Sequence, residues 1–290
     1  MDQINNILVT LSFDTPEQAE INHALTLATL YNSKVTFLSV IPEFSSEEQL
    51  QISAMSPQQR LDKLVLERKN DLEILAKQNQ TYNISTYVAI GKPSDVIVKC
   101  ATQHQHDLII IGSRPKRTLK EKLFGSTANA VLRRSSVPVL AIQPEHSDKY
   151  TRIMASVDIS QDSEIINNKV ISEAISLAES DNSELHALSV IPAKMPIQDG
   201  KDPKQEAKQI LSDLIKAQNA NVADQHLHIG TGDAANVMYE KVKKHNIDLL
   251  VMGMASRRGI MGFFVGNLAE RILATVECSI LIVKPDGFKG

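Results

Sequence analysis

Two glycine-containing segments, one in each half of the chain, have the composition of a phosphate-binding loop. The first reads Gly112-Ser-Arg-Pro115, then nine residues, then Gly125-Ser126-Thr127; the second reads Gly253-Met-Ala-Ser256, then nine residues, then Gly266-Asn267. A glycine at the end of a strand lets a ligand approach the backbone closely. A second glycine followed by Ser, Thr or Asn opens a helix whose free N–H groups can bind an anion. From spacing alone, a simple turn followed by a helix N-cap fits equally well.

A further glycine pattern, Gly230-Thr-Gly-Asp-Ala-Ala235, matches the dinucleotide-binding string GxGxxA. That fingerprint belongs in the first strand-to-helix turn of a domain, whereas this one follows the third predicted strand of its half. We therefore interpret it as a turn and a helix start. The sequence has no P-loop, no GxSxG elbow, no HExxH motif and no SGGxDS-type loop, so it assigns no catalytic residue.

Histidines are the candidate metal ligands. His226 and His228 are two residues apart on a predicted strand, so their side chains share one face. No further Cys, Asp, Glu or His follows at the spacing of a metal site, and we expect none here. His104 and His106 lie at a polar helix end, where they are expected to be solvated or to cap carbonyl groups.

Composition narrows the class of protein. The 290 residues carry 31 Lys+Arg against 34 Asp+Glu, a net charge of -3, which argues against nucleic acid as a partner. The basic residues between Arg114 and Lys122 lack interleaved aromatic residues and are typical of a phosphate-facing loop or a solvated surface.

No apolar run approaches the ~18 residues that span a bilayer, and the N-terminus does not resemble a signal peptide. Cys100 and Cys278 have no CxxC spacing. We expect a soluble cytoplasmic protein with free thiols and no membrane partner.

The two glycine segments belong to an internal repeat. Gly91-Lys-Pro-Ser-Asp-Val-Ile recurs 141 residues later as Gly232-Asp-Ala-Ala-Asn-Val-Met. Leu38-Ser-Val-Ile-Pro42 recurs unchanged as Leu188–Pro192. The repeat predicts two domains, residues 1–145 and 150–290, joined by a polar linker.

Short runs rich in Ile and Val alternate with amphipathic segments in each copy. The runs are 7–11, 35–41, 84–90, 108–111 and 137–142 in the first copy, and 153–157, 184–191, 225–229, 248–252 and 278–283 in the second. Runs this apolar suit strands that are covered on both faces. Alternation of strands and helices implies βαβ units and a parallel sheet. The sequence therefore predicts an α/β fold with two tandem five-stranded parallel α/β sandwich domains.

The glycine pattern, following the apolar strands Asp107–Gly112 and Asp248–Gly253, resembles the nucleotide loop of the universal stress protein family. Phe264-Val-Gly-Asn267 and Lys284-Pro-Asp286 are similar to segments of its tandem, E-type members. The resemblance covers both halves and implies the family's fold, which is like that of the adenine nucleotide α-hydrolases. It also implies that the last strands of the two domains, Val137–Ile142 and Ser279–Val283, pair as an internal pseudo-dimer, since both would otherwise be exposed apolar edges. Further self-association is left open.

The resemblance also implies a nucleotide site, which departs from the family pattern in both domains. In nucleotide-binding members, an Asp after the first strand contacts the ribose or base; Asp158 holds that position in domain 2 and Ser12 in domain 1. The second motif glycine is Pro115 in domain 1, which lacks an N–H group, and Ser256 in domain 2. We therefore expect a ligand mainly in domain 2, at Ser156, Val157, Asp158, Val190, Met252, Gly253, Ser256, Gly266, Asn267 and Leu268. A weaker second site would comprise Ser12, Val40, Gly112, Arg114, Gly125, Ser126 and Thr127.

Three functions follow as alternatives. The first is a stress-response regulatory protein that binds ATP, another nucleotide or a related phosphate-bearing molecule, with Mg²⁺ only where ATP is bound. The second is a slow ATP hydrolase, which needs a metal and a water-positioning group; the sequence offers Asp158 but no base. The third is a degenerate scaffold whose loops bind nothing and whose helices recruit partners, which Ser12 and Pro115 favour for domain 1 alone. We favour the first, with no enzymatic activity.

Overall fold

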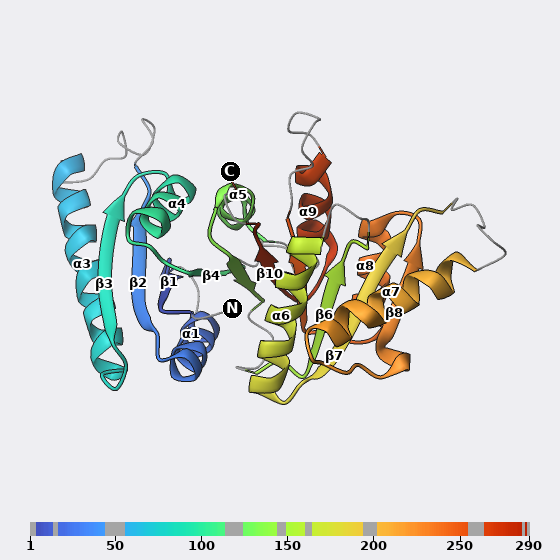
Figure 1. Cartoon of the computed structure of the whole chain (residues 1–290). Coiled ribbons are helices and arrows are strands. Elements are labelled where there is room, and N and C mark those ends of the chain that lie inside the picture. Colours follow the sequence, from blue (N-terminus) through green and yellow to red (C-terminus); the bar gives the residue numbers. More distant parts are fainter. Residues whose placement is uncertain are drawn as a thin grey trace.

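The computed structural model describes residues 4–13, 17–43, 56–113, 124–143, 149–159, 164–193, 202–254, 264–285 and 288. Of the last helix, the side chains of residues 264–267 and 269–270 are outside this description. The described strands form one ten-stranded sheet in the order β3-β2-β1-β4-β5-β10-β9-β6-β7-β8 (Figure 1). Each half contributes five consecutive strands of that order, so the predicted α/β fold with two five-stranded domains is confirmed.

The bounds of the elements follow the predicted runs closely. The strands are β1 Asn6–Thr10, β2 Lys34–Ile41, β3 Ile84–Ile90, β4 Leu108–Gly112, β5 Val139–Ile142, β6 Arg152–Val157, β7 Glu184–Ile191, β8 Leu227–Thr231, β9 Leu249–Gly253 and β10 Ser279–Val283. The helices are α1 Gln18–Tyr31, α3 Pro57–Gln78, α4 Pro93–Gln103, α5 Ser126–Arg134, α6 Glu164–Asp181, α7 Pro203–Ala217, α8 Ala234–Lys244 and α9 Phe264–Thr275.

One strand is displaced from its predicted position. The run 225–229 was expected as a strand, but β8 begins at Leu227 and is preceded by the 3₁₀ turn η2, Asp224–His226. The amide of His226 donates to the carbonyl of Ala223 (2.8 Å), which closes this turn and delays the strand. The sequence predicted His226 and His228 on one strand, and this prediction is wrong: His226 lies in η2 and His228 in β8.

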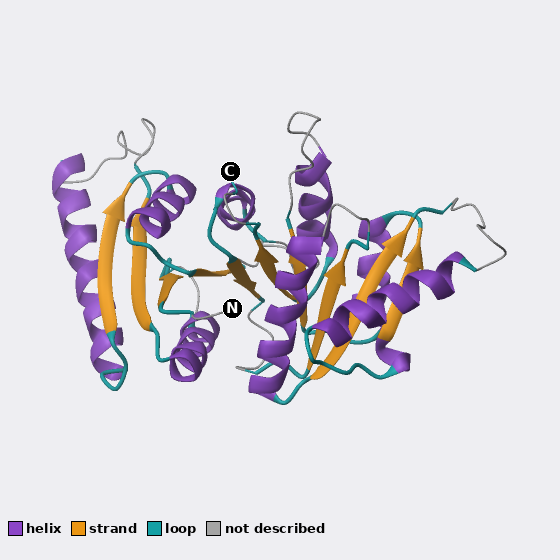
Figure 2. Ribbon diagram, in the orientation of Figure 1, coloured by secondary structure: helices purple, strands orange, loops and turns teal. Residues whose placement is uncertain are grey.

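Helices cover both faces of the sheet (Figure 2). One buried cluster joins residues of α1, α3, α6 and α7 to one face, and a second joins α4, α5, α8 and α9 to the other. Alternate residues of a strand serve the two clusters: Ile7 and Val9 of β1 lie in the first, and Leu8 in the second. Burial on both faces explains why the strands read as continuous apolar runs without alternation. None of the described helices is long and apolar enough to cross a membrane.

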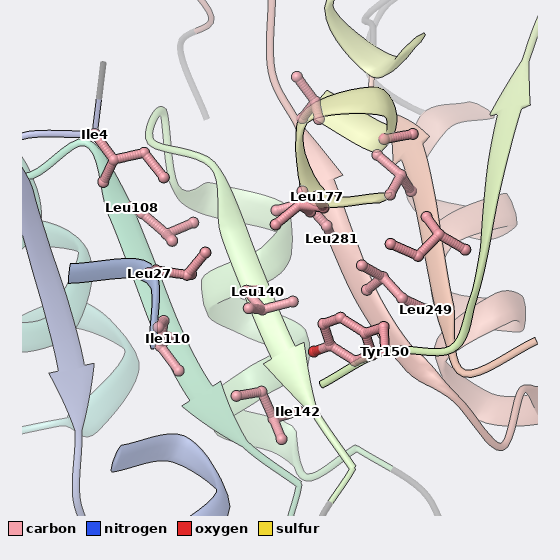
Figure 3. Packing of buried hydrophobic residues seen from close by; sticks show 14 of the residues in the cluster. Ile4, Leu27, Leu108, Ile110, Leu140, Ile142, Tyr150, Leu177, Leu249 and Leu281 are labelled. Atoms are coloured by element: carbon pink, nitrogen blue, oxygen red, sulfur yellow. The ribbon is translucent and has the colours of Figure 1, made fainter. Parts of the chain in front are cut away.

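Antiparallel pairing of β5 with β10 joins the two halves. Leu140 is opposite Leu281, while every other described strand pair is parallel. In Figure 3, Leu140 and Leu281 lie in the middle of a buried cluster that continues into both halves. The predicted pairing of the last strands, and with it the internal pseudo-dimer, is confirmed. The predicted boundary between the domains falls largely on residues 144–148, outside the described residues.

Side chains outside the sheet also connect the halves. The ring of His23 in α1 stacks on that of Tyr150, which precedes β6, with 4.7 Å between the ring centroids. The ammonium group of Lys284, which follows β10, donates to the carbonyl of Leu132 in the last turn of α5 (2.7 Å). A cation at a helix C-terminus is favourable. Burial nevertheless lowers the pKa of Lys284 to about 7, because its ammonium is removed from water.

Replacing Leu140 with alanine tests the energetic weight of the junction. Leu140 is 2% exposed, so Leu140→Ala should lower the free energy of unfolding by about 2–5 kcal/mol. Urea unfolding followed by circular dichroism measures this change. Leu66→Ala on α3 is the control, because Leu66 is 60% exposed and should matter by less than about 0.5 kcal/mol. If both variants lose the same small amount of unfolding free energy, the junction is not tightly packed.

Candidate ligand site

A cavity opens in domain 1 where the strand order reverses. The chain passes from β1 to β2 on one side and places β4 on the other, so a crevice forms at the carboxyl ends of β1 and β4. A cavity of ≈ 140 Å³ occupies this position. Six of the residues predicted for this domain line it: Ser12, Val40, Gly112, Gly125, Ser126 and Thr127. The seventh, Arg114, lies outside the described residues.

The N-terminus of α5 faces this cavity. Gly125 is the N-cap residue, and no side chain of the described residues caps the helix. The first intrahelical bond runs from the amide of Asn129 to the carbonyl of Gly125 (3.0 Å), so the N–H groups of Ser126, Thr127 and Ala128 have no partner within the helix. A Cβ atom added at Gly125 would meet no atom of the described residues within 4 Å, so none of them fills the space in front of it. These amides give the cavity a wall of partial positive charge.

Two glutamates of the α1 segment bring carboxyl groups to the same cavity, which the sequence analysis missed. Glu17 Oε1 accepts hydrogen bonds from the amides of Ser12 and Phe13 and so holds the turn after β1. Burial raises the pKa of Glu17. Domain 1 thus carries carboxyl groups in its crevice although Ser12 replaces the expected aspartate.

Glu20 is the more unusual of the two. It is 5% exposed, and its Oε2 atom has no hydrogen-bond partner among the described residues. Burial raises the pKa of Glu20 to about 7, because the charged form is costly away from water. A Cβ atom at Gly112 would lie 1.6 Å from Glu20 Oε1, so the glycine leaves the space that this carboxyl fills. The sequence does contain a signal for this burial, because Glu20 lies at helical spacing from the apolar residues Ala24 and Leu27 and so shares their buried face of α1.

In domain 2, an asparagine holds the turn that Glu17 holds in domain 1. Asn167 Oδ1 accepts from the amide of Asp158 (3.1 Å), and Asn167 Nδ2 donates to the carbonyl of Asp158 (2.5 Å). The predicted ligand residue Asp158 is exposed directly after β6, at the carboxyl end of the sheet. Its role as a ligand residue stays a prediction.

Above the end of β9, domain 2 is apolar where domain 1 is acidic. A Cβ atom at Gly253 would meet Ile166 and Val170 of α6, at 2.5 Å and 3.4 Å. Ile166, with Val170 beside it, thus fills the space above Gly253 that Glu20 fills above Gly112. The two crevices share a backbone and differ in the chemistry of one helix face.

The other residues predicted for domain 2 separate into three groups. Met252 is buried in the cluster under α8 and α9, and Val190 and Leu268 pack against that cluster. Val157 is buried in the opposite cluster, so the structure does not bring it to the others. Ser156 is buried, Ser256 lies outside the described residues, and Gly266 and Asn267 lie in the first turn of α9 without described side chains.

Comparison with known proteins gives a consistent result. The sequence model described as "Universal stress protein family" matches residues 3–143 and again residues 149–284. The chain is 21% identical to Universal stress protein E of Escherichia coli K12 over an alignment of 309 residues, gaps included. The alignment covers 100% of this chain and 96% of that protein. A universal stress protein structure from Archaeoglobus fulgidus DSM 4304 superposes with a TM-score of 0.69 at 20% identity, covering 97% of this chain and 99% of the other. A structure from Pseudomonas aeruginosa UCBPP-PA14 gives a TM-score of 0.74 at 22% identity, covering 98% and 94%. At these identities the structures show the fold alone.

The buried carboxyl of Glu20 predicts a pH-dependent stability. Because its pKa is raised from 4.5 to about 7, the folded chain holds a proton there that the unfolded chain has lost, and stability falls as the pH rises through this interval. Glu20→Gln removes this dependence. The free energy of unfolding of the variant relative to the unmodified chain should therefore rise by up to about 3 kcal/mol between about pH 5 and about pH 8. Urea unfolding across this pH range is the measurement. Glu73→Gln, at an exposed site on α3, should leave the slope unchanged; a slope that persists in Glu20→Gln would refute the assignment.

Proposed function

The chain belongs to the universal stress protein family, and from that premise we propose that this stress-response protein binds a nucleotide or a related phosphate-bearing ligand. One observation carries the proposal: the cavity at the carboxyl ends of β1 and β4 ends on the uncapped N-terminus of α5. Open α/β sheets bind ligands in this crevice, and a helix N-terminus there offers amide donors to an anion.

The phosphate is assigned to the amides of Ser126, Thr127 and Ala128. Gly125 leaves open space in front of them, so phosphate oxygens can approach the backbone. The hydroxyl groups of Ser126 and Thr127 are further donors. Each hydrogen bond to a charged oxygen contributes roughly 1.5–3 kcal/mol, so a few of them suffice for binding.

The remainder of the ligand extends beyond the phosphate position. The cavity of ≈ 140 Å³ is smaller than the roughly 300–1,000 Å³ of ordinary ligand pockets, so it encloses only part of a nucleotide. Leu38 and Val40 at the end of β2 line the cavity with apolar surface suited to a base. Glu20, whose Oε2 has no partner in the described part of the chain, is suited to a ribose hydroxyl and takes the role that an aspartate after the first strand would have.

The two domains are supported by different observations. The described cavity favours domain 1, whereas the sequence favours domain 2 through Asp158, Gly253 and the segment Gly266–Asn267. Domain 2 therefore remains our second proposed site, with Asp158 accepting a ribose hydroxyl. One pair of matched variants distinguishes the two.

In the alternative of slow ATP hydrolysis, Glu20 would face the attacking water in place of a ribose hydroxyl and would supply the base that the sequence lacked. A buried carboxyl whose pKa is about 7 is suited to act as a general base toward water at neutral pH. Evidence for hydrolysis would be the release of phosphate from ATP in the presence of Mg²⁺. The Glu20→Gln variant should then bind ATP but release no phosphate. If the unmodified chain binds ATP and releases no phosphate, the regulatory function is supported and hydrolysis is excluded.

Valine substitutions at Gly125 and Gly266 test the proposal. Gly125 is the N-cap of α5, whereas α9 begins at Phe264, so Gly266 lies inside the first turn and does not open the helix as the sequence predicted. Gly125 has a φ of -66° and open space at its Cβ position, so Gly125→Val should fold normally and block the phosphate. Affinity should fall at least about tenfold, or about 1.4 kcal/mol. The measurement is calorimetric titration with ATP, AMP and a uridine diphosphate sugar. Gly266→Val is the matched variant of domain 2, and the larger loss identifies the main site. Absence of binding by the unmodified chain, or no loss in either variant, would refute the proposal.

A further inference from the structure

A cluster of histidines lies at the amino ends of β7 and β8, away from the ligand crevices at the carboxyl ends. His186 is in β7, His228 is in β8, and His245 is the C-cap residue of α8. One ligand atom from each of the three lies within 4.8 Å of those of the other two. His186 Nδ1 is 3.0 Å from His228 Nε2, and the rings of His228 and His245 are 4.2 Å apart between centroids.

The fold positions these residues from three separate elements. Leu188 of β7 is in register with His228 of β8, and His186 is two residues before Leu188, so all three side chains share one face. That face is covered by α8, whose residues Met238 and Val242 pack in the same cluster as Leu188. Because α8 ends over the amino ends of the strands, its C-cap residue His245 completes the group.

We propose that His186, His228 and His245 form a binding site for a divalent transition metal ion such as Zn²⁺. Three imidazoles are a common zinc ligand set, with the fourth position left to water. Zn–N bonds of about 2.0–2.1 Å in a tetrahedron separate the nitrogens by about 3.3 Å. The 3.0 Å between His186 Nδ1 and His228 Nε2 is close to this value, and the three ligand atoms, which lie within 4.8 Å of one another, would move closer together to bind one ion.

The surroundings keep the imidazoles in the form that binds metal. A ligand nitrogen must be unprotonated. Burial lowers the pKa of His228 to about 3, and it also lowers the pKa values of His186 and His245. A lowered pKa favours the neutral ring, which is the form that binds a metal ion.

Glu184 supplies the outer contact that metal-binding histidines generally have. Its Oε1 atom is 2.7 Å from His186 Nε2. When His186 donates its Nε2–H to this carboxylate, its Nδ1 atom keeps a lone pair directed at His228, and the ring orientation is fixed. His226 stacks on His186 at 4.4 Å and lies 3.2 Å from the same carboxylate oxygen. Glu184 also opposes part of the electrostatic effect of Lys241 and Lys244 on His245.

A purely structural role explains the cluster less well. The Nε2 atom of His245 is buried and has no hydrogen-bond partner among the described residues, which is costly unless another group binds it. The fold does not require histidines here, because the corresponding positions of domain 1 are Thr36, Tyr87 and His104. Only His104 retains the residue type, so a complete ligand set occurs in one half.

Metal titration of the full chain tests the site. The chain, prepared without a histidine tag and freed of metal with a chelator, is titrated with Zn²⁺ by calorimetry and with Co²⁺ by visible absorption. We expect one ion per chain and a tetrahedral Co²⁺ spectrum. Glu184→Gln should weaken binding about 10–100-fold, as loss of an outer contact does, and His228→Ala should weaken it more. His104→Ala, the matched change in domain 1, should have no effect.

Stability measurements keep the test independent of folding defects. Urea unfolding of each metal-free variant establishes that it is folded at the titration temperature. His245→Ala, at a half-buried position, provides a second ligand variant if His228→Ala is destabilised. Zn²⁺ should raise the unfolding midpoint of the unmodified chain and not that of the ligand variants. No stoichiometric binding, or equal affinity in the unmodified chain and the folded ligand variants, would overturn the proposal.

Discussion

The antiparallel pairing of β5 with β10 is the constraint on which the rest of the structure depends. Each half alone would end in an apolar strand whose outer N–H and C=O groups have no partner, which is an aggregation hazard. Pairing satisfies both edges and places two fully buried strands at the centre of one sheet. Helices then meet across the same junction, where the hydroxyl groups of Tyr31 in α1 and Ser176 in α6 are 2.5 Å apart. The chain is therefore one body built from two copies of a fold.

Once the junction fixes the sheet, the crevices at its carboxyl ends are free to diverge. The turn after the first strand needs a side chain that hydrogen-bonds its backbone, and Glu17 and Asn167 meet this need with different groups. The space above the glycine that ends the fourth strand of each half needs only a side chain of suitable size, so Glu20 fills it in domain 1 and Ile166, with Val170, fills it in domain 2. A shared backbone thus places a carboxyl group above Gly112 and apolar side chains above Gly253, and the two crevices differ in chemistry at this position.

The histidine cluster uses the other end of the strands. Parallel strands place their carboxyl ends at one edge and their amino ends at the opposite edge, so β7 and β8 can carry a metal site without disturbing the crevice of domain 2. The amino ends of β2 and β3 have no equivalent group, since Thr36 and Tyr87 take the places of His186 and His228. Divergence of the repeat has therefore changed both edges of the sheet.

The sequence by itself determined the repeat, the strands, the parallel α/β fold and the pairing of the last strands. These follow from local composition and period, because a strand buried on both faces must be apolar along its length, and from a resemblance to known tandem chains. It also pointed to Gly112 and Gly125, which line the cavity of domain 1, since a glycine followed by a helix start is a local pattern. Only the tertiary structure decided which polar residues meet. Glu20 reaches the end of β4 from 92 residues earlier in the chain, and His186 and His245 join His228 from either side of it. Such groups carry no spacing signal, because their proximity is set by strand register and helix packing, which a search for closely spaced ligands does not see.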